Sequence, residues 1–488
     1  MQAVQSSRRL TADQKINIAF DAMSGMTITH TANKHGVSRG CVYAHQDKAK
    51  QAIYEAFDDT GDDRHVLFYV PVTKAFLYQV VLALVLICKS SYRDAMQFIR
   101  DIFDHSISLG QVAHLMKVAS HQAQEINQGY DLSHIQNSAT DELYHWNQPI
   151  LAVVDIPSRF CAMLTKEECR DGDTWAVSLM DLMAQGYQPA VYICDHAMGM
   201  KAGFETALPD TQLRFDHFHL IASTHKLLRS LKNQTASATT AVSKLQSRME
   251  KAKAKKQGRR LSAKLTAANS RLSKTQELYE LVNTLCGWLL YDVLQLPGIK
   301  PNERGRLYDF IVEELSALKT QHRRIAAYVS SLKNQKQHLL AVSHTLHEAF
   351  EQITADYQVS IEDVWGICYN TRFECQALAY HQHSQPLADR LGEQYECIED
   401  EVLAIMARTH RCSAMIENFN SRLRLTIDQR KPFNNRQLVL RQFILNHRPF
   451  QRSHHTHLIG KTPAEALTGE PHRHWLELLG YQRFKKPA

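Results

Sequence analysis

Two acidic residues of this 488-residue chain stand where carboxylates could do chemistry. Asp141 lies inside an expected strand, residues 138–146, and a charge buried in a strand is costly unless a partner compensates it. Asp195 directly follows the apolar run 191–194, and the carboxyl ends of strands are where open sheets place ligands. If the fold brings them together, the two carboxylates repel each other unless a divalent cation neutralises them. Oxygen ligands of this kind favour Mg²⁺ or Mn²⁺.

A third carboxylate, Glu417, lies in a segment with helical periodicity. Its polar stripe consists of Glu417, Asn420, Ser421 and Arg424, and its apolar stripe of Ile416, Phe419 and Leu423. We expect the apolar stripe to pack on a sheet, because it covers one side of the helix. Glu417 would then reach a metal site, with Asn420 beside it and Arg424 available for a phosphate.

The elements that must position these acids follow a particular order. Strands are expected at 138–146, 150–155, 160–165, 190–194 and 212–217, and helices at 174–185 and 199–207. Three strands joined by turns, followed by two strands that each come after a helix, is the order of an RNase H-like α/β core. Its first and fourth strands are adjacent. Asp141 and Asp195 are therefore expected to meet, in a core formed by residues 135–222 and 409–488.

Other polar residues near the expected site have more than one candidate role. Glu142 and Asp155 are alternatives to Asp141 as the first acidic metal ligand. Of the two, Asp155 is expected to contact the metal ligands rather than the metal itself. His217 and His219 alternate along the expected fifth strand, so both should point to the same face. A buried, hydrogen-bonded histidine is the common outcome for such residues, and a phosphate contact near the metal is the alternative.

Residues 1–57 have helix-turn-helix spacing. Three helical patterns cover residues 10–23, 28–35 and 38–50, and Gly36 stands where the turn requires an unhindered backbone. The third helix would present Arg39, Tyr43 and Lys48 to a DNA groove. The alternative is a three-helix bundle without a DNA partner.

After an expected linker at 58–63, residues 64–130 repeat a three-helix pattern. This segment is either a second DNA-binding module or a helical brace for the domain that follows.

Residues 223–408 have few strand signals and are expected to form a long helical insertion, which makes the chain mainly α overall. Fourteen Lys or Arg and one acid lie between Lys226 and Lys274, among them Lys251, Lys253, Arg259 and Arg260. Such a run is often just a solvated helix face, whereas in a DNA-handling protein it predicts phosphate contacts. From Arg422 to Lys461 nine Lys or Arg stand against one acid, and Arg422 and Arg424 are expected to lie along DNA.

The composition is that of a soluble globular protein, with 44% hydrophobic and 22% charged residues and a net charge of +7. The ten cysteines contain no Cys-x-x-Cys pair and are expected to be reduced thiols. The start of the chain has no apolar stretch suited to a signal peptide. A cytoplasmic location, at the bacterial nucleoid, is expected.

Several motifs resemble the catalytic domain of bacterial insertion-sequence transposases of the DDE type. They are Thr-Asp-Glu-Leu at 140–143, Cys-Asp-His-Ala at 194–197, Phe-Asp-His-Phe-His at 215–219, Ile-Glu-Asn-Phe-Asn-Ser-Arg-Leu-Arg at 416–424, Asn-His-Arg at 446–448 and Gly-Lys-Thr-Pro-Ala-Glu-Ala at 460–466. The resemblance covers about a third of the chain, and its least typical feature is the long gap before Glu417.

The resemblance implies that Asp141, Asp195 and Glu417 bind two Mg²⁺ or Mn²⁺ ions. It implies metal-dependent cleavage of double-stranded DNA at transposon ends and transfer of the freed 3′-hydroxyl into target DNA, by a homodimer or larger assembly. Two alternatives stay open. A transposase-derived DNA-binding regulator would dispense with the acids, and a metal-dependent RNase H-like nuclease would cut without joining strands.

Overall fold

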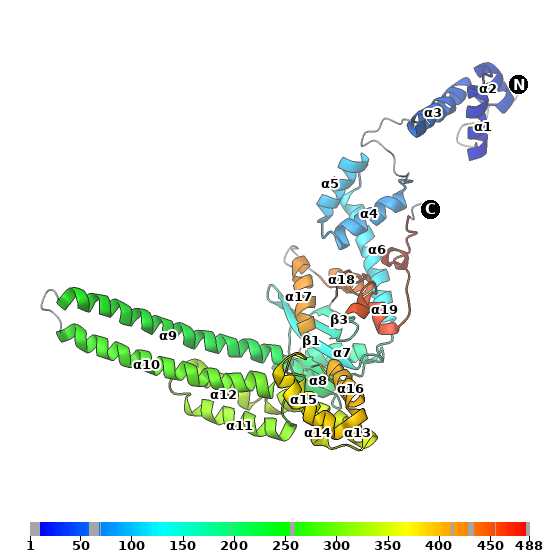
Figure 1. The fold of residues 1–488 in the computed structure, drawn as a ribbon. Coiled ribbons are helices and arrows are strands. Elements are labelled where there is room, and N and C mark those ends of the chain that lie inside the picture. Colours follow the sequence, from blue (N-terminus) through cyan, green and yellow to red (C-terminus); the bar gives the residue numbers. More distant parts are fainter. Residues whose placement is uncertain are drawn as a thin grey trace. The chain divides into compact units, whose positions relative to one another are not determined.

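A computed structural model describes residues 10–57, 68, 70–195, 197–253, 259–410, 414–427, 434–453 and 455–484. The expected linker at 58–63 lies outside the described residues. The fold is mainly helical and contains a small mixed sheet of five strands (Figure 1). The chain divides into two compact units, residues 1–72 with 484–488, and residues 73–483. No helix in the described part is long and apolar enough to cross a membrane.

The first unit contains three helices, α1 (Ala12–Met23), α2 (Ile28–His35) and α3 (Arg39–Phe57). Thr11 begins α1 with a capping box that it shares with Gln14, which satisfies backbone N–H groups of the first turn. Gly36 ends α2 at φ +62°, a left-handed conformation that favours glycine. The helix α3 runs seven residues beyond the expected end at residue 50. A small core between the helices includes Ile18 and Val42.

The second unit begins with α4 (Lys74–Leu86), α5 (Tyr92–Phe103) and α6 (Leu109–Gln128). Their core also contains residues of α18 (Asn435–His447) and α20 (Trp475–Leu478), for example Phe443 and Trp475. The helix between them, α19 (Pro463–Thr468), instead places Ala464 in the core on the α7–α8 side of the sheet. Arg441 of α18 donates to the Leu86 carbonyl, which ties α18 to the end of α4. This packing favours the role of a brace over that of a free DNA-binding module for α4–α6.

The sheet contains β1 (Asn137–His145), β2 (Gln148–Asp155), β3 (Cys161–Lys166), β4 (Val191–Cys194) and β5 (Gln212–Phe215) in the order β3-β2-β1-β4-β5. The strands β1, β2 and β3 form an antiparallel meander, and β4 lies parallel to both β1 and β5. Helices α7 (Gly172–Met183) and α8 (Met198–Ala207) come before β4 and β5 respectively. The expected adjacency of the first and fourth strands is confirmed.

Both faces of the sheet are buried, and each has its own apolar core. On one face Tyr192 and Phe215 pack with Trp175 of α7 and Phe204 of α8. On the other face Ala152 and Ile193 pack with α17 (Ala414–Ile427) and with α18. The strand β3 lies at an edge of the sheet, and α18 packs along it. Asn446 of α18 accepts from the Cys161 N–H and donates to the Cys161 carbonyl. The covered edge leaves no backbone groups of Cys161 open to pairing with another strand.

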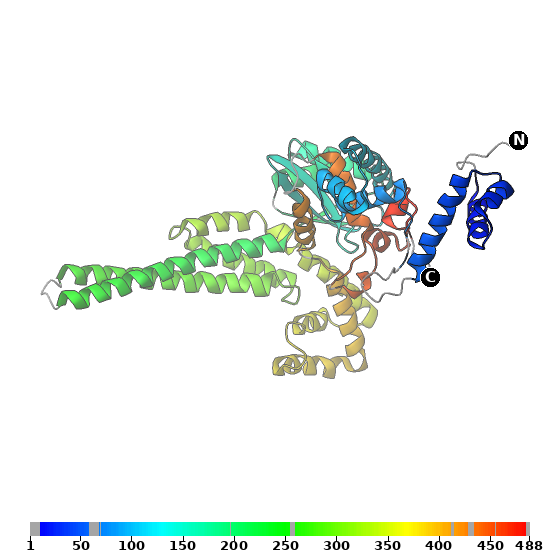
Figure 2. The same cartoon turned by 90° about the horizontal axis from the view of Figure 1, so that it is seen from above.

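The described part of residues 217–408 consists of helices joined by short turns and contains no strand. Its elements are α9 (His217–Lys253), α10 (Arg259–Trp288), the π-helix η2 (Leu289–Val293), α11 (Pro301–Ala317), α12 (Arg323–Lys333), α13 (Lys336–Tyr357), α14 (Ile361–Asn370), α15 (Leu378–Leu391), the short η3 (Gly392–Gln394) and α16 (Tyr395–Arg408). Helices α9 and α10 run side by side as a long hairpin (Figures 1 and 2). A short 3₁₀ turn, η4 (Thr456–Leu458), lies in the C-terminal segment.

Candidate active site

The strand register brings acidic residues to one edge of the sheet. Ala139 of β1 pairs with Ile193 of β4 in parallel, so two residues further along each strand Asp141 and Asp195 stand level. Residues two apart on a strand point to the same face. Cys194 of β4 pairs with Phe215 of β5, which sets Asp216 level with Asp195 in the same way. Three acids therefore follow one another across neighbouring parallel strands.

Asp141 is the half-buried centre of this group. Its Oδ1 accepts from the Glu142 N–H at 2.7 Å, and its Oδ2 accepts from the Asn420 Nδ2. The pKa of Asp141 is raised to about 6, chiefly by burial, although the Glu142 N–H opposes the rise. The carboxylates of Asp195 and Glu417 raise this pKa further. Asp195 and Glu417 are thus each close enough to Asp141 to repel its charge.

Asp195 lies where β4 ends, and its Oδ1 accepts from the Ala197 N–H at 3.0 Å. This bond fixes the turn that leads into α8. Asp195 lines a cleft of about 530 Å³ together with Gly199 and His219. His196, part of the Cys-Asp-His-Ala motif, lies outside the described residues.

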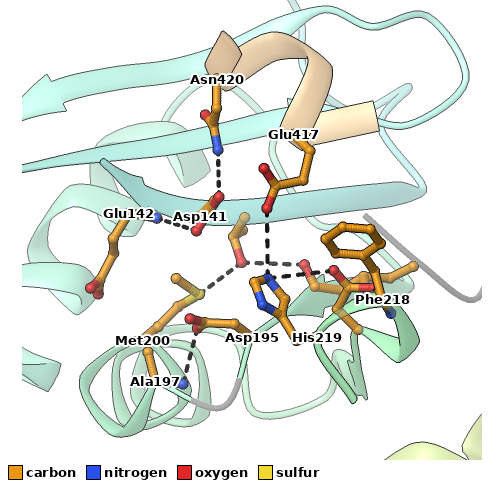
Figure 3. A network of polar contacts seen from close by, with 12 residues as sticks. Asp141, Glu142, Asp195, Ala197, Met200, Phe218, His219, Glu417 and Asn420 are labelled. Atoms are coloured by element: carbon orange, nitrogen blue, oxygen red, sulfur yellow. Dashed lines mark hydrogen bonds and ion pairs between the residues drawn. The ribbon is translucent and has the colours of Figure 1, made fainter. Parts of the chain in front are cut away.

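Glu417 is positioned by the packing of α17 on the sheet. Ile416, Phe419 and Leu423 are buried against β1 and β2, as the apolar stripe in the sequence predicted. This packing turns the adjoining stripe, with Glu417 and Asn420, toward Asp141. The side chains of Glu417, Asn420 and Asp141 gather at one place although they come from different elements (Figure 3).

His219 stands between two of the acids. Its Nε2 lies 4.0 Å from the Glu417 Oε1 and 3.7 Å from the Asp216 Oδ2 (Figure 3). The expected pairing of His217 and His219 along the fifth strand is wrong, because β5 ends at Phe215 and α9 begins at His217. On this helix the two rings point apart. His217 is buried, and its Nε2 lies 2.9 Å from the Leu339 carbonyl oxygen.

The two competing acids make other contacts. Glu142 accepts from Trp175 Nε1 and from Arg170 Nη1, both at 3.0 Å, and these two donors hold its carboxylate. Asp155 was expected to support the metal ligands, but in the described part of the chain its carboxylate makes its hydrogen bonds elsewhere. Its buried carboxylate instead accepts from the N–H and hydroxyl of Ser158, in the turn between β2 and β3.

Sequence reasoning missed Asp216. Its side chain is fully buried, and its Oδ1 accepts from the Phe218 N–H at 2.8 Å. The pKa of the buried Cys194 thiol is raised well above its usual value, first by burial and then by Asp195 and Asp216 on either side. A signal was present, since Asp216 follows the apolar end of its strand just as Asp195 does.

The donor set fits a divalent metal. Carboxylate oxygens are the ligands that Mg²⁺ and Mn²⁺ prefer, and the mutual repulsion at Asp141 is what a cation would relieve. The Asn420 Oδ1 is buried and has no hydrogen-bond partner among the described residues, so it is available to accept from water around an ion. As they stand, no three His, Cys, Asp or Glu side chains within the described ranges are arranged to enclose an ion.

The residues expected to contact DNA lie on several helices. Arg39, Tyr43 and Lys48 are exposed on α3 of the first unit. Lys251, near the end of α9, and Arg260, at the start of α10, are also exposed. Those two stand beside the turn of the α9–α10 hairpin.

Two further residues expected at DNA, Arg422 and Arg424, are exposed on α17, the helix of Glu417. The side chains of Lys253 and Arg259 lie outside the described part of the chain.

Comparison with known protein families gives no match, and comparison with curated proteins gives no significant one.

Proposed function

We propose that the chain is a DNA transposase that uses Asp141, Asp195 and Glu417 as a metal-binding triad in an RNase H-like core. The observation that carries this proposal is geometric: Asp141 and Asp195 stand level on adjacent parallel strands, and Asn420 of α17, one turn after Glu417, binds Asp141. Acids this far apart in sequence, on two strands and a helix, share one site only because the fold brings them there. The sheet order β3-β2-β1-β4-β5, with its antiparallel meander and two parallel strands, supports the same core.

Each residue of the site has a role in this proposal. Asp141, Asp195 and Glu417 would hold two Mg²⁺ or Mn²⁺ ions, which activate water and stabilise the attacking and leaving oxygens of a phosphodiester. Asn420 orients Asp141 through its amide N–H. His219 stands close to Glu417 and Asp216 and would hold the Glu417 carboxylate in place. Arg424 is exposed on the same helix and would meet the DNA backbone.

The reaction proposed has two steps on DNA. Water cleaves the phosphodiester at the end of the mobile element, and the freed 3′-hydroxyl then attacks a phosphodiester of the target in line. No covalent bond to the protein is required. The helices α1–α3 would recognise the element ends, and two ends handled together imply a dimer or larger assembly at the bacterial nucleoid.

A strand-transfer assay tests the proposal. The full chain would be incubated with Mg²⁺, a labelled duplex carrying one end of the DNA that flanks the gene, and a plasmid target. We expect joined products with the wild type and none with Glu417→Gln. Asp210→Asn, an exposed acid outside the site, is the matched control and should keep full activity. Cutting without joining would indicate a nuclease, and binding alone a DNA-binding regulator, and either would overturn the proposal.

A further inference from the structure

A second cavity adjoins the helix that carries Glu417. Its volume is about 610 Å³, within the range of roughly 300–1,000 Å³ found for sites that bind small ligands. Asn418, Phe419 and Arg422 of α17 line one side, and residues 448–453, which follow α18, line another. Because Glu417 and Asn418 are neighbours on one helix, this cavity and the acidic site occupy adjacent faces of α17.

The cavity is lined by positive charge. Arg159, Arg422, Arg448 and Arg452 contribute to its walls, and none of its described lining residues is an acid. Although Arg422 is exposed to solvent, the protein atoms around the cavity partly desolvate its guanidinium and lower its pKa, and the nearby Arg448 lowers it further. Arg422 and Arg448 also lower the pKa of Lys89, after burial and Arg441. Cations gathered in this way repel one another, and an anion between them would relieve the repulsion.

The backbone conformation at Arg159 helps to place this residue in the cavity wall. Arg159 has a φ of +65°, a conformation that is strained for a residue other than glycine. The turn that imposes it is held by Asp155, whose carboxylate accepts from Ser158 and whose carbonyl accepts from the Arg159 N–H at 3.0 Å. The buried acid that sequence reasoning assigned to the metal site therefore serves to present Arg159.

An aromatic wall accompanies the arginines. Phe450 donates its N–H to the Lys461 carbonyl and accepts from the Gly460 N–H, each at 2.9 Å, so its backbone is held from both sides. Asn418 offers an amide donor and acceptor beside it. Arginines that bind phosphate, a ring on which a base can stack, and an amide that can read a base edge together match a nucleotide.

We infer that this cavity binds one unstacked nucleotide of a DNA strand, with its phosphate against Arg422 and Arg448 and its base against Phe450. The inference rests on the proposed function and deepens it, since it names the part of the substrate held beside the acids. A duplex is too wide for a cavity of this size. The nucleotide therefore comes from a single strand or a frayed end, or is flipped out of a duplex.

Photocrosslinking tests the inference on the full chain. The probe is a single-stranded oligothymidylate, about eight nucleotides long, with one central 5-iododeoxyuridine, and EDTA is present so that no strand is cut. Irradiation joins the iodinated base to an aromatic ring on which it stacks. We expect mass spectrometry to map the crosslink to Phe450. A crosslink that maps only to other parts of the chain would overturn the inference.

Variants separate the contribution of charge from that of stacking. Arg422→Gln with Arg448→Gln should lower the crosslink yield by roughly tenfold or more, because two phosphate contacts are lost. Arg324→Gln removes an exposed charge from α12 and should leave the yield unchanged. Phe450→Ala and the milder Phe450→Leu should each weaken binding of the probe by roughly fivefold or more, while their melting temperatures confirm the fold. Unchanged binding in folded Phe450 variants would contradict the role of stacking.

Competitors identify the source of the nucleotide. An unlabelled oligothymidylate should block the crosslink far better than the same strand with an abasic centre. Thymidine monophosphate that competes as well as the strand would overturn the assignment to DNA and indicate a free nucleotide. Asp195→Asn should crosslink like the wild type. A wild-type chain that forms the crosslink but joins no strands would refute the proposed function alone, and a wild-type chain that joins strands without the crosslink would refute the cavity alone.

Discussion

Asp141 and Asp195 stand level on adjacent parallel strands, because Ala139 of β1 pairs with Ile193 of β4 two residues earlier. His219, on α9, is the cation-forming group that offsets the charge at Asp141. Repulsion between the carboxylates at this edge of the sheet therefore destabilises the folded protein when no cation is bound. Sites that bind cations share this property.

Asp195→Asn should separate stability from function. Without divalent ions, the free energy of unfolding should stay the same or rise by up to about 1 kcal/mol, since one of the repelling charges is lost. The Ala197 N–H keeps an acceptor in the new side chain. Strand cleavage should fall by roughly a thousandfold or more, because a metal ligand is lost. Chemical denaturation and cleavage rates measure the two effects.

Glu142→Gln is the contrasting variant. Its carboxylate is held by Arg170 and Trp175, so the change should lower stability. If Asp195→Asn were as destabilising as Glu142→Gln, the repulsion inferred at the edge would be wrong.

The packing of α7 against α8 predicts a strong effect of Gly203→Ala. A Cβ at residue 203 would lie 2.3 Å from the Trp175 Cβ, in a contact that neither helix can relieve by a side-chain rotation. We expect a loss of roughly 2–3 kcal/mol in the free energy of unfolding. Gly305→Ala, inside α11 with open space around it, is the control and should be neutral or stabilising by about 0.5–1 kcal/mol. Equal melting temperatures for the two variants would contradict this packing.

The buried His447 predicts a dependence of stability on pH. Its Nε2 lies 2.7 Å from the Tyr130 hydroxyl and its Nδ1 2.7 Å from the Phe443 carbonyl, and burial lowers its pKa to about 4. Between pH 6.5 and 4, His447 is therefore protonated in the unfolded chain and neutral in the folded chain. Stability should fall across this range as the pH is lowered, by roughly 3 kcal/mol from this residue.

Urea unfolding at pH 7 and pH 4.5 measures this effect. In His447→Gln the difference between the two pH values should shrink. A difference as large as in the wild type would show that other groups cause the acid sensitivity.

The α9–α10 hairpin predicts a salt-dependent contribution to DNA binding. Replacing Lys251 and Arg260 with glutamine should lower the slope of log affinity against log salt by about 0.9 for each phosphate contact removed. Both side chains are exposed near the hairpin turn. Lys319→Gln, an exposed lysine after α11, is the control. A solvated hairpin without a DNA role would give the same slope in all three proteins.

The sheet was predictable because its strands carry strong local signals. Apolar runs with turns between them defined all five strands within two residues, and the alternation of strand and helix defined their order. The end of β5 was the exception. Phe215-Asp-His-Phe-His reads as an alternating strand, but Asp216 accepts from the Phe218 N–H and so starts a helix at His217. That local hydrogen bond outweighs the alternation.

The site was predictable in part, for a related reason. Asp141, Asp195 and Glu417 could be chosen because each stood at a defined point of a regular element. For Asp155, the position in the strand does not reveal that Ser158 engages its carboxylate. The cavity lined by Arg159, Arg422 and Arg448 could not be predicted from the sequence. Its walls come from the β2–β3 turn, from α17 and from the irregular segment that follows α18, and the turn is remote in sequence from the other two.

Anomalous diffraction from crystals grown with Mn²⁺ tests the central claim most directly. The account predicts two anomalous peaks, roughly 4 Å apart, between the carboxylates of Asp141, Asp195 and Glu417. Ligand oxygens should lie roughly 2.1 Å from the ions. The peaks should vanish in Asp195→Asn. Ordered Mn²⁺ bound only elsewhere, or a site that leaves out Glu417, would contradict the triad.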